Sequence, residues 1–366
     1  MAKYLPLQMI DTINEYTKGI PGGMLAHFNL FKEKKWIPEN AELEQYSDFV
    51  FSSDFFNPEY KGPFEKINHQ LIFDKNLNNI FVPHCDFFQV KERRTEWVDI
   101  LGINLIIHKW EGYKIVYKPD NDFFHELKNT QNLLLTKEIF TSLPFNVMYI
   151  DLSNVTDIEP FIGAFVYVHN DNDMITAAIH MAINEHTTFS YYSHMNFREE
   201  KELPFKKNSL PEGELEFIDI DKHLKLQTTK IQKKDTRHDI INTIMQILTF
   251  ISVKAPDISE NPNTKKSYKP SNVIKNKFSE VQMYDIGIRY GNAIRTAKKE
   301  IADVMHKQKS EKTETIRKPI RPHIRCAHWQ RYHTGHGRSE TITKWIPPVY
   351  VCGKTEIQVV IHELKK

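Results

Sequence analysis

The side chains best suited to chemistry gather near the C-terminus of this 366-residue chain, between Arg321 and Gly353. This stretch carries five Lys or Arg residues and four histidines against one acid, Glu340, and it adds four Trp or Tyr rings. Guanidinium and ammonium groups bind phosphate oxygens, and flat rings stack on unpaired bases. The pattern therefore predicts a nucleic-acid interface, most naturally for RNA. The residues assigned to it are Arg321, Arg325, Trp329, Arg331, Tyr332, Arg338, Lys344 and Trp345.

Metal-independent cleavage of RNA is a second chemistry open to the same segment. It requires a group that accepts a proton, a group that donates one and a cation that stabilises the developing charge. His323 and His328 could be the acid and base, and Arg325 could be the cation. A spacing of five puts the two histidines on no common face of a helix or strand. The sequence therefore leaves open whether the chain is an enzyme, and a non-enzymatic role is favoured.

Zinc binding and a purely structural role are the remaining interpretations of this segment. Cys326, His328, His333 and His336 are zinc-ligand types, but their spacing is loose and no C-x-x-C pair accompanies them. Alternatively, the Arg, His and Trp side chains bond to one another and hold a small domain together. We therefore expect neither a metal nor another cofactor.

Charge is distributed unevenly along the chain. From His306 onward there are thirteen Lys or Arg residues against five Asp or Glu, whereas the preceding residues hold 36 against 42. An acidic body with a basic C-terminal segment favours a polyanionic partner for that segment. The alternative is that the basic segment docks on its own acidic body.

Composition limits the class of protein and its compartment. No apolar core of a secretory signal follows Met1, and no run of about 18 apolar residues predicts a membrane span. The three cysteines are far apart and form no C-x-x-C pair, which is typical of free thiols in a reducing compartment. We expect a cytoplasmic protein that has no membrane partner.

The elements that must position these residues predict an α+β fold. Residues 1–235 are expected to form a body with an antiparallel sheet and flanking helices. Its clearest strands are 147–152, 162–169, 174–183 and 187–192, and the turn cluster Asn170 to Asp173 predicts an antiparallel pair. Further strands are expected at 103–109, 113–118 and 215–220, the first two joined as a hairpin, and a helix is expected over 123–140.

Residues 236–305 are expected to be a helical segment. Apolar residues at helical spacing predict one long helix over 236–253, and a possible capping box predicts a second from Ser279 to about Met305. Residues 256–270 between them are typical of a loop. Gly287 and Gly291 would let another element approach closely, and Arg289, Arg295, Lys298 and Lys299 predict a solvated face. Residues 306–366 form the basic module, with strands expected at 341–346, 349–351 and 356–362.

The basic module resembles a known family. The run from Arg321 to Arg338, R-P-H-I-R-C-A-H-W-Q-R-Y-H-T-G-H-G-R, followed by K-W-I-P-P-V-Y-V-C-G, is similar to the C-terminal motif of the second-named anti-CRISPR family against type V-A systems. Residues 255–258 and 284–287 are similar as well, and the likeness covers roughly residues 240–353. Positions that match the motif are Arg321, Pro322, His323, Arg325, His328, Trp329, Tyr332, Gly335, Gly337, Trp345 and Pro347.

The resemblance implies a function for the whole chain. Members of this family, encoded on phages, plasmids and other mobile elements, recognise the N-terminal peptide of the nascent effector nuclease, and the message under translation is destroyed. The basic module would contact RNA or the ribosome, and we assign peptide recognition to the body, residues 1–235. Relatives occur where no type V-A effector is expected, so the target could be another protein. A ribonuclease and a stoichiometric protein-binding inhibitor remain the alternatives.

Overall fold

The structure is a computed structural model, and it describes a defined part of the chain. The described residues are 6–10, 24–52, 54, 59–68, 94–130, 134–171, 174–182, 187–198, 202–204, 215–219, 226–229, 237–261, 280–310, 323–338, 340–352 and 355–359. Arg321, most of the loop predicted over 256–270 and residues 311–318 of a tether predicted over 306–318 lie outside these ranges. Residues 306–310 are helical, so the tether prediction is wrong there. Within the described ranges, no helix combines the length and the apolar character that crossing a bilayer requires.

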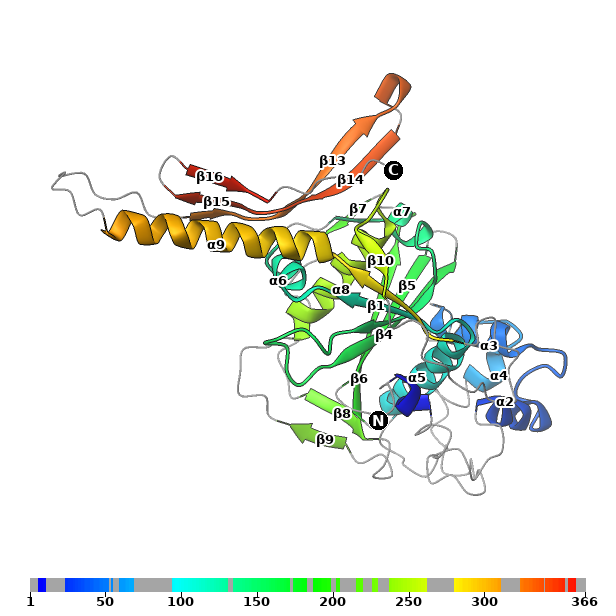
Figure 1. The fold of residues 1–366 in the computed structure, drawn as a ribbon. Coiled ribbons are helices and arrows are strands. Elements are labelled where there is room, and N and C mark those ends of the chain that lie inside the picture. Colours follow the sequence, from blue (N-terminus) through cyan, green and yellow to red (C-terminus); the bar gives the residue numbers. More distant parts are fainter. Residues whose placement is uncertain are drawn as a thin grey trace.

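One nine-stranded sheet forms the centre of the protein (Figure 1). Its order is β10-β11-β1-β3-β4-β5-β6-β8-β9. The strands are β1 (Ile115–Pro119), β3 (Val147–Asp151), β4 (Gly163–Asp171), β5 (Met174–Ala182), β6 (Thr187–Asn196), β8 (Leu215–Asp219), β9 (Leu226–Thr229), β10 (Ile258–Glu260) and β11 (Gln282–Ile286).

The run of strands predicted from residues 147–192 is confirmed. β3, β4, β5 and β6 pair in sequence order, each antiparallel to the next. Asp171 pairs with Met174 at the end of the β4–β5 ladder, around the predicted turn cluster. The sheet is nevertheless mixed, because β1 lies between β3 and β11 and is parallel to both. The α+β class is confirmed, with a sheet that is antiparallel over most of its width.

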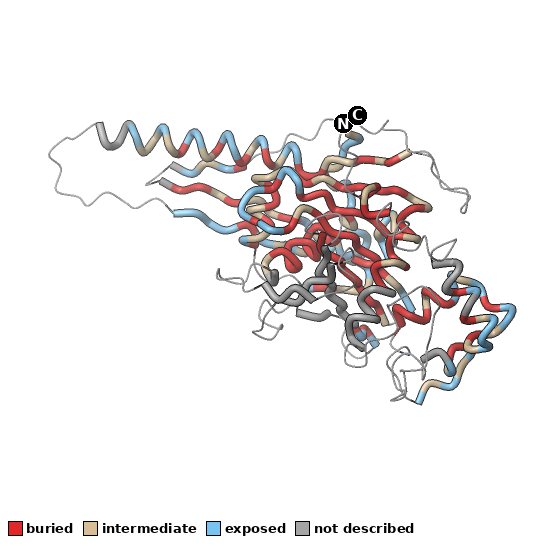
Figure 2. Tube along the Cα trace, turned by 90° about the horizontal axis from the view of Figure 1, so that it is seen from below, coloured by how far each residue is buried: buried red, intermediate tan, exposed pale blue. Residues whose placement is uncertain are grey.

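Helices cover both faces of this sheet. One face carries α5 (Arg94–Tyr113) with α2 (Met24–Glu33), α3 (Leu43–Phe51) and α4 (Glu65–Asn68) nearby. The other face carries α6 (Asn121–Asn129), α7 (Lys137–Thr141) and α8 (Arg237–Ser252). The strands feed both cores because their side chains alternate. Val147 and Tyr149 enter the α5 side, while Met148 and Ile150 enter the α8 side. Figure 2 shows the buried residues concentrated in the sheet and in the helices against it.

The predicted hairpin over 103–118 is half wrong. Residues 94–113 form the single helix α5, so the first predicted strand is absent. The second predicted strand is present as β1. Ile103, Ile106 and Trp110 are fully buried, at a spacing of three and four that places them on one helical face. The run of branched apolar residues fits a strand or a buried helix equally, and packing against the sheet selects the helix.

Two helix predictions also change. Residues 237–252 form α8 as expected, but the helix predicted from Ser279 is preceded by a strand. Gln282–Ile286 is β11, and α9 (Ile288–Ser310) begins after Gly287, whose φ of 72° ends the strand. The helix predicted over 123–140 divides into α6, the strand β2 (Leu134–Thr136) and α7. β2 pairs with β7 (Glu202–Pro204), a distant partner that local periodicity does not reveal.

The C-terminal module consists of strands that lie along α9, on the side of the central sheet that α8 covers (Figure 1). β12 (His323–Arg325), β15 (Val349–Cys352) and β16 (Thr355–Gln358) form one small sheet. β13 (His328–Thr334) and β14 (Glu340–Ile346) form a two-stranded ribbon, with the short helix η6 (His336–Arg338) at its end. The strands expected at 341–346 and 349–351 are confirmed, and the third is present over 355–358. Trp345 and Tyr350 belong to the α8-side core, so the module is continuous with the body.

Candidate nucleic-acid interface

The β13–β14 ribbon has two chemically different faces. In an antiparallel ladder, directly opposed residues point to the same face, and successive residues alternate. Trp329 opposes Trp345, and Arg331 opposes Thr343, which places these four on the inner face toward the body. Their neighbours in the ladder, His328, Gln330 and Tyr332 with Ile346, Lys344 and Ile342, lie on the outer face.

Trp345 is buried, so it cannot present a ring to RNA. Only 3% of the residue is exposed, and its indole N–H donates to Thr130 Oγ1 at 3.1 Å. The ring meets Phe123 and Tyr290 edge to face, with centroid distances of 5.2 and 5.1 Å. A buried indole commonly finds such a hydrogen-bond partner. The assignment of Trp345 to the nucleic-acid interface is therefore wrong, and the residue anchors the module.

Trp329 forms a second anchor beside it. Its indole N–H donates to Gln246 Oε1 at 3.1 Å, and the Gln246 amide donates in turn to the Leu127 carbonyl at 2.8 Å. Gln246 is fully buried in α8, where an unpaired amide would be costly. The ring is half-buried, so the predicted stacking role of Trp329 is open only to its remaining exposed edge.

The outer side of the module keeps several of the predicted residues. His323, Arg325, His328 and Lys344 are exposed, and Tyr332 is 42% exposed. The Arg325 guanidinium donates to Glu356 Oε1 at 2.8 Å, an exposed ion pair of small energetic worth that leaves Arg325 accessible. Arg331 is half-buried on the inner face, and Arg338 lies in η6. The exposed positions define the outer face: His323, Arg325, His328, Tyr332 and Lys344.

The structure places the proposed acid and base in different sheets. His323 lies in β12 opposite Val351, and His328 lies in β13 opposite Ile346. β12 belongs to the β12-β15-β16 sheet and β13 to the two-stranded ribbon, so no shared strand face presents both imidazoles to one phosphodiester. The structure does not support the zinc interpretation either, because no three His, Cys, Asp or Glu side chains converge within the described residues.

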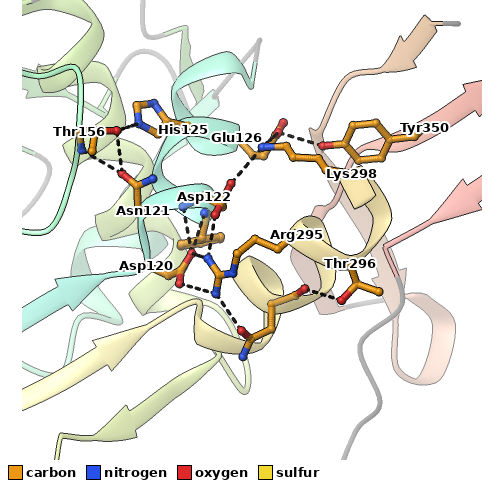
Figure 3. Close-up of polar contacts among 12 residues, drawn as sticks. Asp120, Asn121, Asp122, His125, Glu126, Thr156, Arg295, Thr296, Lys298 and Tyr350 are labelled. Carbon is orange, nitrogen blue, oxygen red and sulfur yellow. Dashed lines mark hydrogen bonds and ion pairs between the residues drawn. The ribbon is translucent and has the colours of Figure 1, made fainter. Parts of the chain in front are cut away.

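An ionic network fixes α9 and β15 against α6 (Figure 3). Arg295 donates to Asp120 through two nitrogens at 3.0 and 3.1 Å and to Asp122 at 2.8 Å. Lys298 reaches Asp122 at 3.1 Å and Glu126 at 3.4 Å. The solvated face predicted for these cations is confirmed, since Arg295 is exposed and Lys298 is partly exposed, and both also form ion pairs there. The acidic partners lie more than 170 residues away, so no local pattern could have identified them.

The same network continues to the C-terminal module. The Tyr350 hydroxyl donates to Glu126 Oε1 at 3.2 Å, and burial together with the Glu126 charge raises the Tyr350 pKa. Gly291 in α9 allows Asp120, at the start of α6, to come close to the α9 backbone. A Cβ at position 291 would lie 1.8 Å from Asp120 Oδ1. The predicted close approach at this glycine is confirmed, and α6 is the element that approaches.

Replacing Asp122 with Asn should lower the free energy of unfolding by about 1 kcal/mol near pH 7, because its cationic partners are partly exposed and screened by solvent. Burial alone would raise the Asp122 pKa, but hydrogen bonds from Arg295 and Lys298 outweigh it and hold the pKa below its ordinary value of 3.8. A depressed pKa stabilises the fold above the unfolded pKa, and this contribution is lost as the pH falls through the folded pKa. Urea unfolding of both proteins at several pH values measures the difference.

The difference between wild type and Asp122→Asn should therefore shrink as the pH is lowered from about 5 toward 3. Glu300→Gln, an exposed carboxylate on the same helix α9, is the matched control and should change little at any pH. A difference that stays constant down to pH 3 would contradict the ionic role of Asp122.

Residues 255–258 and 284–287, the two further segments that resemble the family, meet at the start of α9. β10 pairs antiparallel with β11, which places residues 255–258 beside residues 284–287. The Asp257 carboxylate accepts from the Arg289 backbone N–H at 2.8 Å and from its Nε at 2.6 Å. The Gly287 N–H donates to the Asp257 carbonyl at 2.8 Å. A carboxylate at a helix N-terminus satisfies its unpaired N–H groups and its positive end, so these segments orient α9.

Comparison with known proteins gives a sequence match and a weak structural one. The family model described as AcrVA2-like, the anti-CRISPR type V subtype A2 family, matches residues 117–353. No curated protein matches the chain. A solved structure described as the crystal structure of AcrVA2 has 15% sequence identity, with 94% of this chain and 99% of that chain covered, at a TM-score of 0.39.

Proposed function

The chain belongs to the anti-CRISPR type V subtype A2 family, and we propose from this that it lowers the level of a target protein through the target's mRNA. In this proposal the chain recognises the N-terminal peptide of the nascent target, a type V-A effector nuclease or another protein, in the cytoplasm of the host cell. The C-terminal module then contacts the RNA or the ribosome. Residues 1–235 supply the peptide-recognition surface.

The outer face of the module is the observation that carries the RNA part of the proposal. The module uses its inner face to dock, through Trp329 and Trp345, which leaves the opposite face available to a partner. That face offers Lys344 and Arg325 to phosphates and the Tyr332 ring to a base. Alternating cations and an accessible ring are the features with which proteins bind single-stranded RNA.

The charge distribution supports the same division of roles. The basic residues after His306 suit a polyanion, and the acidic body before it would repel one. RNA would therefore be steered to the module, while the body stays available to a peptide. The ribonuclease alternative receives no support from geometry, since His323 and His328 lie on successive strands.

Removing the outer-face groups should weaken RNA binding without unfolding the protein. The double variant Tyr332→Ala with Lys344→Ala deletes one ring and one cation, which predicts a loss in affinity of roughly 10- to 100-fold for single-stranded RNA. Binding is measured as the shift of a labelled oligoribonucleotide with the full chain. Lys299→Ala, an exposed cation on α9, is the matched control and should bind as wild type does.

The same assay distinguishes the alternatives. Binding without cleavage that falls steeply with added salt supports the proposal. Cleavage that disappears in His323→Ala would support the ribonuclease instead. Absence of any shift at low salt, together with tight stoichiometric binding of the folded target, would support a protein-binding inhibitor. In cells, the proposal requires the level of the target mRNA to fall when the encoded N-terminal peptide is intact. The level should be maintained when the amino-acid sequence of that peptide is changed.

A further inference from the structure

A cleft of about 830 Å³ lies on the inner side of the ribbon, on the surface opposite the outer face. Three elements enclose it: the β13–β14 ribbon, the segment around α7 and the C-terminal end of α8. These elements are far apart in sequence, so the cleft exists only because the module docks on the body. Its volume falls within the range of about 300–1,000 Å³ that is typical of small-molecule sites.

Cations dominate the charge of the cleft. Lys137, Lys254 and Arg331 line it, and Glu138 is the acid among its lining residues. Arg331 points inward from the ribbon, and its guanidinium lies 3.5 Å from the Leu134 carbonyl, which places the group at the cleft wall. Lys254 is exposed just after α8. Cations from three separate elements converge on one concave surface, an arrangement that favours an anionic ligand.

The rest of the lining is hydroxyl-rich with an apolar portion. Thr136, Ser142 and Thr343 contribute hydroxyl groups, and Ile139 and Phe197 contribute apolar surface. Thr136 occupies the N-cap position of α7, yet its side chain makes no capping hydrogen bond. Hydroxyl groups can donate to phosphate oxygens and exchange hydrogen bonds with ribose hydroxyls. The lining therefore combines phosphate, sugar and ring complementarity in one place.

We propose that this cleft binds a nucleotide, its phosphate held by Lys137, Arg331 and Lys254 and its ribose by the threonine hydroxyls. The nucleotide is either a free mononucleotide or one unit of an RNA strand that wraps around the ribbon. If the ligand is an RNA strand, the inference rests on the function proposed above. If the ligand is a free mononucleotide, the inference is independent of that function.

The test titrates the full chain with two probes, adenosine monophosphate and an eight-residue single-stranded RNA. The cleft variant is Lys137→Ala with Lys254→Ala, and the second is Thr343→Glu, which introduces an acid from the ribbon into the cleft. Each should weaken binding of at least one probe by tenfold or more. Lys299→Ala serves again as control, and thermal unfolding confirms that each variant is folded.

The outcomes separate the two proposals. Loss of both probes in the cleft variants identifies a site that accepts free nucleotides, and loss of the RNA alone identifies one that reads a strand. Either result supports the cleft. RNA binding that the outer-face double variant abolishes and both cleft variants leave intact, with no binding of the mononucleotide, would overturn the cleft and retain the proposed function. Mononucleotide binding that the cleft variants weaken would sustain the cleft even where the RNA does not bind.

Discussion

Replacing Trp345 with alanine is expected to lower the free energy of unfolding by about 3–5 kcal/mol. The substitution removes one of the largest side chains of the α8-side core and leaves a cavity against Phe123 and Tyr290. It also leaves the Thr130 hydroxyl without its indole partner. The β13–β14 ribbon should then separate from the body before the central sheet unfolds, since its other anchor, Trp329, is only half-buried and the buried Tyr350 holds a different strand, β15.

Equilibrium denaturation and hydrogen exchange measure this effect. Exchange of the β13–β14 amides should accelerate more than exchange of the central strands. Tyr332→Ala is the matched control, because it removes an exposed ring from the same ribbon and should change stability by about 0.5 kcal/mol or less. Equal destabilisation by both variants would show that Trp345 does not anchor the module.

The second large effect is expected at Gly287, between β11 and α9. Gly287→Ala should lower the free energy of unfolding by about 2–4 kcal/mol, from overpacking combined with strain at a positive φ. The backbone has φ of 72°, a conformation that favours glycine, and a Cβ there would lie 2.2 Å from the Phe123 ring. Phe123 is a fully buried residue of α6 whose ring contacts Phe250, Tyr290 and Trp345, so it has little room to move.

Gly112→Ala provides the comparison for this substitution. Gly112 lies in α5, and a Cβ built there meets nothing within 4 Å. Alanine should therefore be neutral or stabilise the protein by up to about 1 kcal/mol, because glycine is unfavourable within a helix. Chemical denaturation of the two variants decides the matter, and a loss at Gly112 as large as that at Gly287 would contradict the argument from conformation and packing.

The described part of the fold was predictable from sequence where a local pattern identifies a segment. The strands from Val147 to Asn196 are short runs with a turn cluster between two of them, and α8 repeats its apolar residues at helical spacing. Residues 103–107 fit a strand or a buried helix equally well, and residues 282–286 were assigned to the helix predicted from Ser279. In the first, burial between α2, α3 and the sheet selects a helix. In the second, pairing with β1 selects a strand.

The candidate interface divides in the same way. Residue types alone identified a segment rich in cations and rings, and the family match extends over it. They did not separate Trp345, which is buried, from Tyr332, which is exposed on the opposite face of the same ribbon. Strand register assigns alternate residues to opposite faces, and docking decides which face is covered. Neither quantity can be read from a list of residue types.

The amino-acid order determined the class of this protein, its long meander, the helix α8 and the chemical character of its C-terminal segment, because each depends on neighbours within a few residues. The tertiary structure decided which cations are bonded, which rings are covered and where a cleft forms. Arg295 meets Asp120, and Trp345 meets Thr130, across 175 and 215 residues of chain. Such contacts depend on the packing of whole elements, and that packing sets which groups remain available to a partner.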